Sequence, residues 1–182
     1  MDCYIFITRA CNLRCSYCCF GDSVFQRTCE NDEGPDVDKT AAFVLREAER
    51  IDEDMKVFFY GGEPSLNESW IRDFVNLTKG RVKYVLQTNG TLLKSMDPAL
   101  LKEMHFLEVS LDGVPSINDG RRGAGSHDRI VENIEAIRPR FDGEIAARMT
   151  YTPENPLYDS VTHILDELKF DHVYWMHEDS TI

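Results

Sequence analysis

CYIFITRACNLRCSYC (residues 3–18) joins a short apolar run to three closely spaced cysteines. The aromatic and β-branched residues of 3–8 are typical of a strand, and Cys11, Cys15 and Cys18 follow shortly after it. The N-terminal residues lack the pattern of a secretion signal, so a reducing compartment is expected, where thiols this dense favour metal or redox chemistry over disulfides. The stretch therefore predicts a strand whose end carries a metal centre.

The same order, a strand followed by a polar motif, recurs along the chain. Helical patterns fill the segments between the strands. Strands are expected at 3–8, 56–62, 83–90, 106–113, 146–152 and 172–177. Expected helix boundaries are N-caps at Asp38, Asp97, Ser126 and Ser160 and ends at Gly80 and Pro139.

This alternation predicts an α/β fold with one parallel sheet and right-handed crossovers. Six strands are too few to close an eight-stranded barrel, so we expect an open (β/α)6 partial barrel. A flat doubly wound sheet is the alternative. The 182 residues are expected to form a single domain, 1–182, with the functional residues on the rim at the carboxyl ends of the strands.

The composition narrows the class of protein. With 42% hydrophobic and 29% charged residues and no apolar run of membrane-spanning length, a globular, cytoplasmic protein is expected. The net charge of -12 disfavours nucleic acid as a partner, since the basic stretch at Arg121, Arg122 and Arg129 is short.

Three thiolates leave a metal centre incomplete. Both [4Fe–4S] clusters and structural zinc ordinarily take four protein ligands, so a three-cysteine set predicts an open position for a small chelating molecule. The alternative is a zinc site completed by Cys19, Cys29, Cys3 or a histidine. Outside that case, the histidines are expected to serve packing or the surface.

The motifs together resemble the radical S-adenosylmethionine (SAM) superfamily. Its C-x3-C-x2-C pattern has an aromatic residue, here Tyr17, just before the third cysteine, and GGEP (61–64), QTNG (87–90) and SLDG (110–113) follow in family order. The resemblance implies that Cys11, Cys15 and Cys18 hold a [4Fe–4S] cluster and that SAM completes it. Reductive cleavage of SAM would give a 5′-deoxyadenosyl radical, with reduced flavodoxin or ferredoxin as electron donor.

The resemblance also implies a set of SAM contacts around that cluster. Each of these residues has a simpler interpretation as a turn, a cap or a surface salt bridge, and Arg148 could equally bind substrate or form a structural ion pair. The expected cofactor-binding residues are Tyr17, Gly62, Glu63, Asn89, Ser110, Arg122 and Arg148.

The segment 110–134 resembles the branch that contains sulfatase-maturing enzymes and thioether-forming peptide maturases. A peptide or protein substrate is therefore expected. Members of that branch usually continue into a cysteine-rich domain, and this chain ends at HEDSTI (177–182), directly after a strand, which favours truncation. The alternatives are a small-molecule or activating radical SAM enzyme, which the absence of a co-encoded precursor peptide would favour, and a zinc-binding interaction module.

Overall fold

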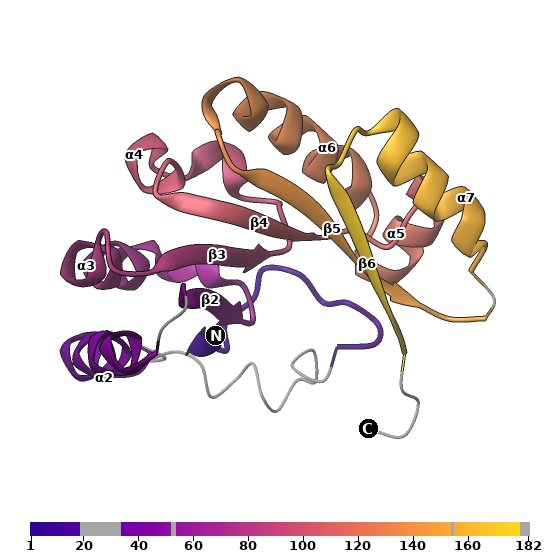
Figure 1. Ribbon diagram of the computed structural model, residues 1–182. Helices are drawn as coiled ribbons and strands as arrows, with labels where there is room; N and C mark the ends of the chain where they lie inside the picture. Colours follow the sequence, from indigo (N-terminus) through magenta and orange to yellow (C-terminus); the bar gives the residue numbers. More distant parts are fainter. Residues whose placement is uncertain (19–33, 52–53, 154, 179–182) are drawn as a thin grey trace.

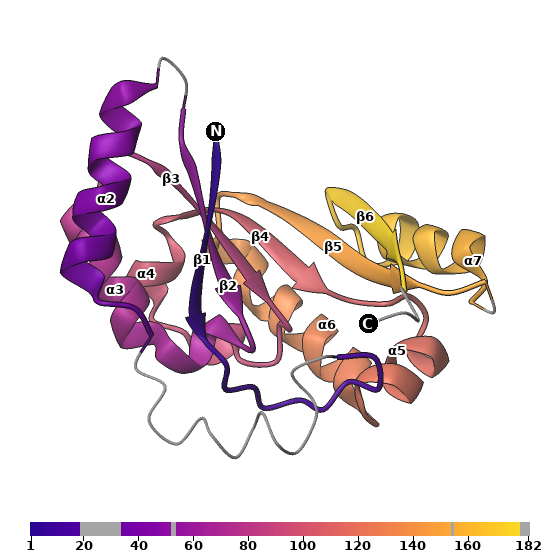
Figure 2. The same cartoon turned by 90° about the horizontal axis from the view of Figure 1, so that it is seen from below.

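Six parallel strands form one curved sheet in the order β1-β2-β3-β4-β5-β6 in the computed structural model, which describes residues 1–18, 34–51, 54–153 and 155–178. The helices lie along the outer face of the sheet (Figure 1), and residues 9–18, which follow β1, run along the carboxyl ends of the strands (Figure 2). The open six-stranded partial barrel predicted from the sequence is confirmed. No helix in these ranges is long and apolar enough to cross a membrane.

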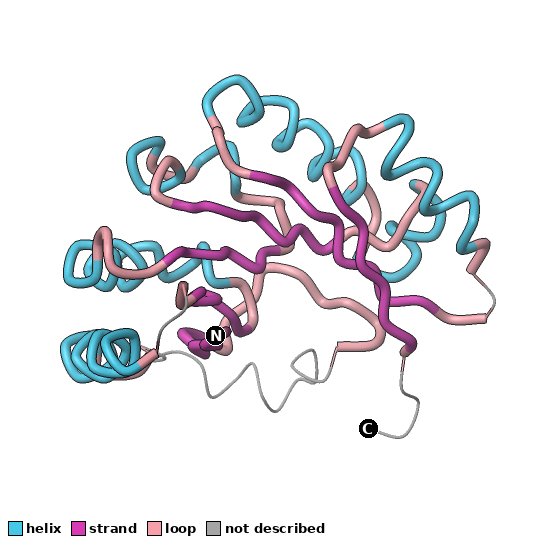
Figure 3. Tube along the Cα trace, viewed as in Figure 1, coloured by secondary structure: helices cyan, strands magenta, loops and turns pink. Residues whose placement is uncertain are grey.

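The elements alternate along the chain, as Figure 3 shows by colour. The strands are β1 (Asp2–Thr8), β2 (Lys56–Gly61), β3 (Lys83–Thr88), β4 (Met104–Ser110), β5 (Glu144–Tyr151) and β6 (His172–His177). The α-helices are α2 (Val37–Arg50), α3 (Glu68–Thr78), α4 (Pro98–Leu101), α5 (Pro115–Arg122), α6 (Ser126–Ile137) and α7 (Leu157–Thr162). Short 3-10 turns occupy Pro64–Asn67, Leu93–Ser95 and Arg138–Arg140, and a π-helical turn, His163–Glu167, extends α7.

Three of the predicted helix boundaries are correct. The Asp97 side chain accepts a hydrogen bond from the Ala99 amide, with Pro98 as the first residue of α4. Gly80 adopts a left-handed φ of 77° just after α3, where a side chain would be strained. The 3-10 turn that contains Pro139 likewise follows the last residue of α6.

Three predicted N-caps are wrong. Helix α2 is capped by Asp36, which accepts from the Lys39 amide, so Asp38 lies inside its first turn. Ser126 is the first residue of α6, and the amides there are capped instead by Asp119, which accepts from Gly125 and His127 at 2.7 and 2.8 Å. Ser160 lies within α7 and is buried. The start of α7, by contrast, has no side-chain cap.

The hydrophobic core fills the space between the sheet and the helices. Phe59 of β2 contacts Phe74 of α3 edge-on, with ring centroids 5.7 Å apart, and Phe74 stacks on Trp70 at 5.3 Å. Further along, His127 of α6 and His163 meet at 2.9 Å between their Nε2 atoms, in a buried contact. This packing fixes the strands, and with them the rim that their carboxyl ends form, seen from below in Figure 2.

Candidate active site

The cysteine loop, residues 9–18, leaves the end of β1 and is held by backbone hydrogen bonds from two directions. The amides of Gly62 and Glu63 donate to the carbonyls of Thr8 and Ala10 at 2.8 and 2.7 Å, and the Ser16 amide donates to the carbonyl of Arg121 at 2.8 Å. The loop is therefore pinned to the end of β2 at one end and to α5 at the other.

The two glycines of GGEP allow this close approach. Gly61 has a φ of 144°, and a Cβ there would lie 2.2 Å from the Thr8 carbonyl oxygen. A Cβ on Gly62 would lie 2.3 Å from the carbonyl oxygen of Ala10. Any side chain at either position would push the cysteine loop away from the rim.

Glu63, by contrast, points its side chain into the protein. Its carboxylate is fully buried and accepts hydrogen bonds from the Ser65 amide at 3.0 Å, the Thr88 hydroxyl at 2.7 Å and the Asn89 amide at 2.6 Å. Burial raises the pKa of Glu63, and these hydrogen bonds offset only part of that effect. The carboxylate thus joins the ends of β2 and β3, and its expected contact with SAM stays a prediction.

Asn89 brings the end of β3 to the first cysteine. Its Nδ2 lies 3.8 Å from the Cys11 sulfur and donates to Asn12 Oδ1 at 2.7 Å, while Asn12 donates to Thr91 at 2.8 Å. The Leu13 amide also donates to the Cys11 sulfur at 3.4 Å. These donors would stabilise a thiolate at Cys11.

Arg122 is buried beside the second cysteine, in contrast to an ordinary surface salt bridge. Its Nε and Nη2 both donate to the carboxylate of Asp112 at 2.9 Å, and its Nη1 lies 4.0 Å from the Cys15 sulfur. Only 6% of Arg122 is exposed and none of Asp112. Although burial alone would lower the pKa of Arg122, the negative charge of Asp112 raises it above its ordinary value, so the guanidinium stays charged.

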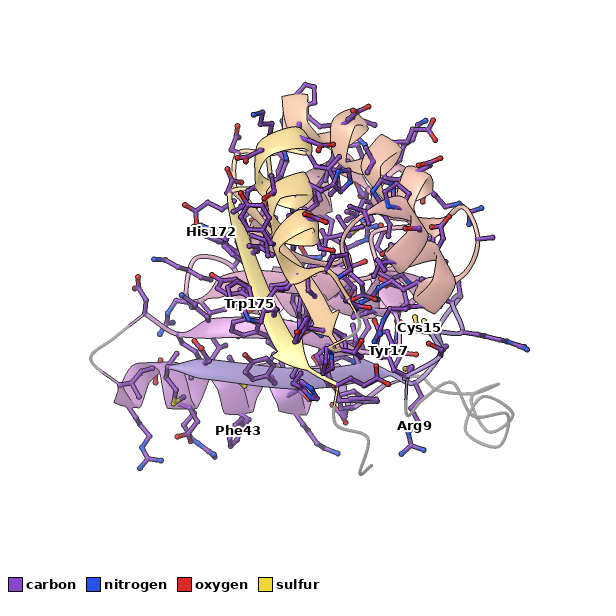
Figure 4. All side chains as sticks on the ribbon, turned by 90° about the vertical axis from the view of Figure 1, so that its right-hand side faces the viewer. Arg9, Cys15, Tyr17, Phe43, His172 and Trp175 are labelled. Atoms are coloured by element: carbon purple, nitrogen blue, oxygen red, sulfur yellow. The ribbon has the colours of Figure 1, made fainter. Side chains whose placement is uncertain are left out.

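Tyr17 completes this network. Its hydroxyl donates to Asp112 at 2.9 Å, and the guanidinium groups of Arg121 and Arg122 lie 4.5 and 5.4 Å from its ring centroid. Burial raises the pKa of the Tyr17 phenol, so it remains a donor. Figure 4 shows Tyr17 and Cys15 close together at this end of the barrel.

Sequence reasoning named Tyr17 and Arg122 but missed Asp112, which connects them. Asp112 also accepts from the Thr150 amide of β5 at 2.8 Å, so the cysteine loop, α5 and β5 meet at one carboxylate. The available signal was the aspartate of SLDG itself, because an acid at the end of a buried strand needs a partner. The partner is Arg122, ten positions further along the chain.

The other two predicted residues lie on adjacent strands. Ser110 ends β4 and is paired in register with Arg148 of β5. Arg148 Nη1 donates to Gln87 at 2.8 Å and approaches Glu108 at 3.4 Å. Of the two interpretations open for Arg148, the ion pair is therefore present, and a contact with SAM or substrate stays a prediction.

The cysteines of the described residues are not arranged around a single metal position. In the described ranges, no three Cys, His, Asp or Glu side chains converge on a single metal position. One zinc would draw its sulfur ligands within about 4 Å of each other, whereas each cysteine of a [4Fe–4S] cluster binds a different iron. Of the proposed fourth ligands, Cys3 lies in β1, and Cys19 and Cys29 lie outside the described residues.

The thiols would need a metal to become thiolates. Burial raises the pKa of both Cys11 and Cys15. Metal binding deprotonates such thiols, and the nearby donors and the Arg122 charge then stabilise the sulfur ligands. The donor set is consistent with the cluster expected from the sequence.

Comparisons with known proteins agree with this geometry. Residues 5–167 match a family model described as "Radical SAM superfamily". The chain is 32% identical over 139 residues to a cysteine-type anaerobic sulfatase-maturating enzyme of Clostridium novyi, a match that covers 70% of this chain and 37% of the relative. It is 26% identical over 178 residues to Fe-coproporphyrin III synthase of Methanosarcina barkeri, covering 94% of this chain and 42% of the relative.

A solved structure has the same fold. The structure described as native anSMEcpe with bound AdoMet and Cp18Cys peptide superposes with a TM-score of 0.73 at 18% identity, covering 97% of this chain and 50% of that one. The chain therefore spans half or less of the length of these relatives.

Proposed function

Because the chain belongs to the radical SAM superfamily, whose enzymes use a [4Fe–4S] cluster and SAM, we propose that Cys11, Cys15 and Cys18 hold the cluster and that the enzyme modifies a residue of a peptide or protein. The cluster and SAM, when bound, supply a 5′-deoxyadenosyl radical that takes a hydrogen atom from the substrate.

One observation carries the proposal: the three cysteines share one loop that the ends of three other strands hold in place. Gly62 and Glu63 fix it from β2 through backbone bonds, Asn89 reaches Cys11 from β3, and Arg122 reaches Cys15 through the Asp112 network at the end of β4. A site built this way holds its sulfur ligands in a fixed arrangement before any cofactor binds.

The remaining rim groups supply what the two ends of SAM require. Backbone carbonyls at GGEP suit the ammonium group, and Nη1 of Arg122, which is not bound to Asp112, suits the carboxylate. Ser110 and Asn89 offer small hydrogen-bonding groups, while Arg148 faces the inner side of the barrel. In this proposal Tyr17 positions the cysteine loop through Asp112.

The peptide substrate rests on the relatives. The sulfatase-maturating enzyme is named for action on a protein, and the anSMEcpe structure holds a peptide. We propose that residues 1–182 form the radical SAM core domain, that the protein works in the cytoplasm and that reduced flavodoxin or ferredoxin supplies the electron.

The test is anaerobic incubation of the cluster-loaded protein with SAM and reduced flavodoxin, followed by quantification of 5′-deoxyadenosine. Wild type should release it, Cys15→Ala should not, and the exposed-loop variant Asp142→Asn should match wild type. Addition of candidate peptides, including a cysteine-containing sulfatase peptide, should increase release and change the peptide mass. Failure of the cluster-loaded wild type to cleave SAM contradicts the proposal.

The similarity to Fe-coproporphyrin III synthase favours a second candidate, a small-molecule substrate such as a tetrapyrrole. In the same assay, stimulation by an iron porphyrin and by no peptide would select it.

A further inference from the structure

The inner face of the sheet, which the outer helices leave uncovered, is lined with aromatic side chains. Tyr4 of β1 is 56% exposed and stacks on Phe58 at 4.4 Å, and at the far edge Tyr174 of β6 is 50% exposed and stacks on His172 at 6.3 Å. In Figure 4, strand β6, on which His172 and Trp175 are labelled, runs along the near edge of the sheet. These two groups of aromatic side chains, Tyr4 with Phe58 and Tyr174 with His172, form aromatic walls that would bury apolar parts of a ligand.

Between these aromatic walls lies an ion pair, Arg148–Glu108. Arg148 projects from β5 toward Glu108 of β4 and Gln87 of β3, which are neighbours in register. The Arg148 side chain is 31% exposed and that of Glu108 14%. Tyr174 of β6 is paired in register with Arg148. On β1, burial raises the pKa of the Tyr4 phenol, the charge of Glu108 raises it further, and that of Arg148 lowers it.

The pair has unused hydrogen-bonding capacity. Nη2 of Arg148 donates to the Met176 sulfur at 3.4 Å, and a thioether is a weak acceptor. Oε2 of Glu108 accepts only the long bond from Arg148, and Oε1 accepts none from the described residues. A strong donor and a strong acceptor therefore lie side by side with incomplete partners.

The charges decide which ligand suits them. A carboxylate bound to Arg148 would face the negative Glu108, and an ammonium bound to Glu108 would face the positive Arg148. A neutral amide avoids both repulsions, because its carbonyl can accept from the guanidinium while its N–H donates to the carboxylate.

We propose that the Arg148–Glu108 pair recognises one amide group of the substrate, with Tyr4 and Tyr174 packing against the groups that flank it. The inference rests on the proposed peptide-modifying function and names its recognition element. A backbone amide and an Asn or Gln side chain share this chemistry.

A binding experiment tests the pair without requiring turnover. The probes are N-methylacetamide, which represents a backbone amide, and propionamide, which represents a side-chain amide. The readout is the ¹³C resonance of the Met176 methyl group in the cluster-loaded protein, assigned with Met176→Leu. Because Nη2 of Arg148 contacts that sulfur, an amide that draws the guanidinium away should shift the resonance saturably.

We expect at least one of the two amides to shift the Met176 resonance. The amide that binds more tightly indicates whether the pair recognises a backbone amide or a side-chain amide. Arg148→Gln and Glu108→Leu should each weaken binding about tenfold, the effect of losing one partner of a hydrogen-bonded pair. Arg81→Met, which removes an exposed ion pair with Glu49, should leave binding unchanged. Equal shifts with acetate or methylammonium, no shift with either amide, or shifts that persist in Arg148→Gln would overturn the proposal.

A second arm separates this inference from the proposed function. Once a substrate peptide is found, Arg148→Gln and Glu108→Leu should raise its KM more than they lower kcat, and Arg81→Met should change neither. If wild type cleaves no SAM, the proposed function fails whatever the probes do. If SAM is cleaved and the variants leave KM unchanged, the amide inference alone fails.

Discussion

Replacing Asp112 with alanine should destabilise the protein far more than an ordinary surface change. Asp112 is fully buried and accepts four hydrogen bonds at 2.8–2.9 Å, two of them from the buried Arg122. Removing one partner of a buried ion pair leaves the other charge uncompensated and costs about 3–5 kcal/mol. For a chain of this size that corresponds to a decrease in Tm of about 6–20 °C.

Urea unfolding of the apo protein under reducing conditions measures this effect. Asp142→Asn is the matched control, because Asp142 lies exposed in a loop, and it should change the free energy of unfolding by less than about 0.5 kcal/mol. Asp112→Ala/Arg122→Met should cost less than the sum of the single variants by about 1–3 kcal/mol, since no unpaired charge remains.

An Asp112→Ala variant as stable as Asp142→Asn would refute the reasoning. So would strict additivity in the double variant, because it would mean that the two side chains do not stabilise each other.

Three further predictions concern the loop, the rim and the core. Gly62→Ala should lower the iron bound after cluster reconstitution, because a Cβ would meet the Ala10 carbonyl. The control is Gly120→Ala in α5, where a Cβ has open space and should stabilise the protein by up to about 1 kcal/mol. Equal iron content in the two variants would contradict this prediction. Burial raises the pKa of Glu63 above its ordinary 4.5, so the stability it contributes is full below pH 4.5 and is lost as pH rises through the folded-state pKa. The urea midpoint of wild type minus that of Glu63→Gln should fall over that interval, and a flat difference would refute it. Phe74→Ala should cost about 3–5 kcal/mol in urea unfolding, while Phe43→Ala, at a side chain 51% exposed, should cost much less.

Local patterns predicted the elements well where one strand or one cap decides the outcome. The alternation of apolar runs and helical segments gave six parallel strands in sequential order, and the Asp97–Pro98 pair began α4 as expected. These features depend on neighbours within a few residues, which the sequence displays directly.

Contacts between residues far apart in the sequence were harder to predict. Ser126 looked like a cap, but Asp119 performs that role from the preceding helix, because α5 and α6 pack together. Asp112 lay within a motif that we had singled out, yet its partners Tyr17 and Thr150 are 95 and 38 positions away. Sequence spacing does not reveal which buried acid will meet which buried base.

The cysteine site was also predicted only in part. Motif order placed Cys11, Cys15, Glu63, Asn89 and Arg122 at one rim, and the contacts described above bring them together there. Their roles as cluster ligands and SAM contacts stay predictions. The inward direction of the Glu63 carboxylate could not be predicted, because it depends on hydrogen bonds with the end of β3.

Electron paramagnetic resonance of the anaerobically reconstituted, reduced protein, with and without SAM, tests the central claim most directly. We expect a [4Fe–4S] signal that changes when SAM is added and that is lost in Cys15→Ala, because three cysteines leave one iron for SAM. A protein that holds stoichiometric zinc and gives no such signal, or a cluster signal that SAM leaves unchanged, would contradict the account.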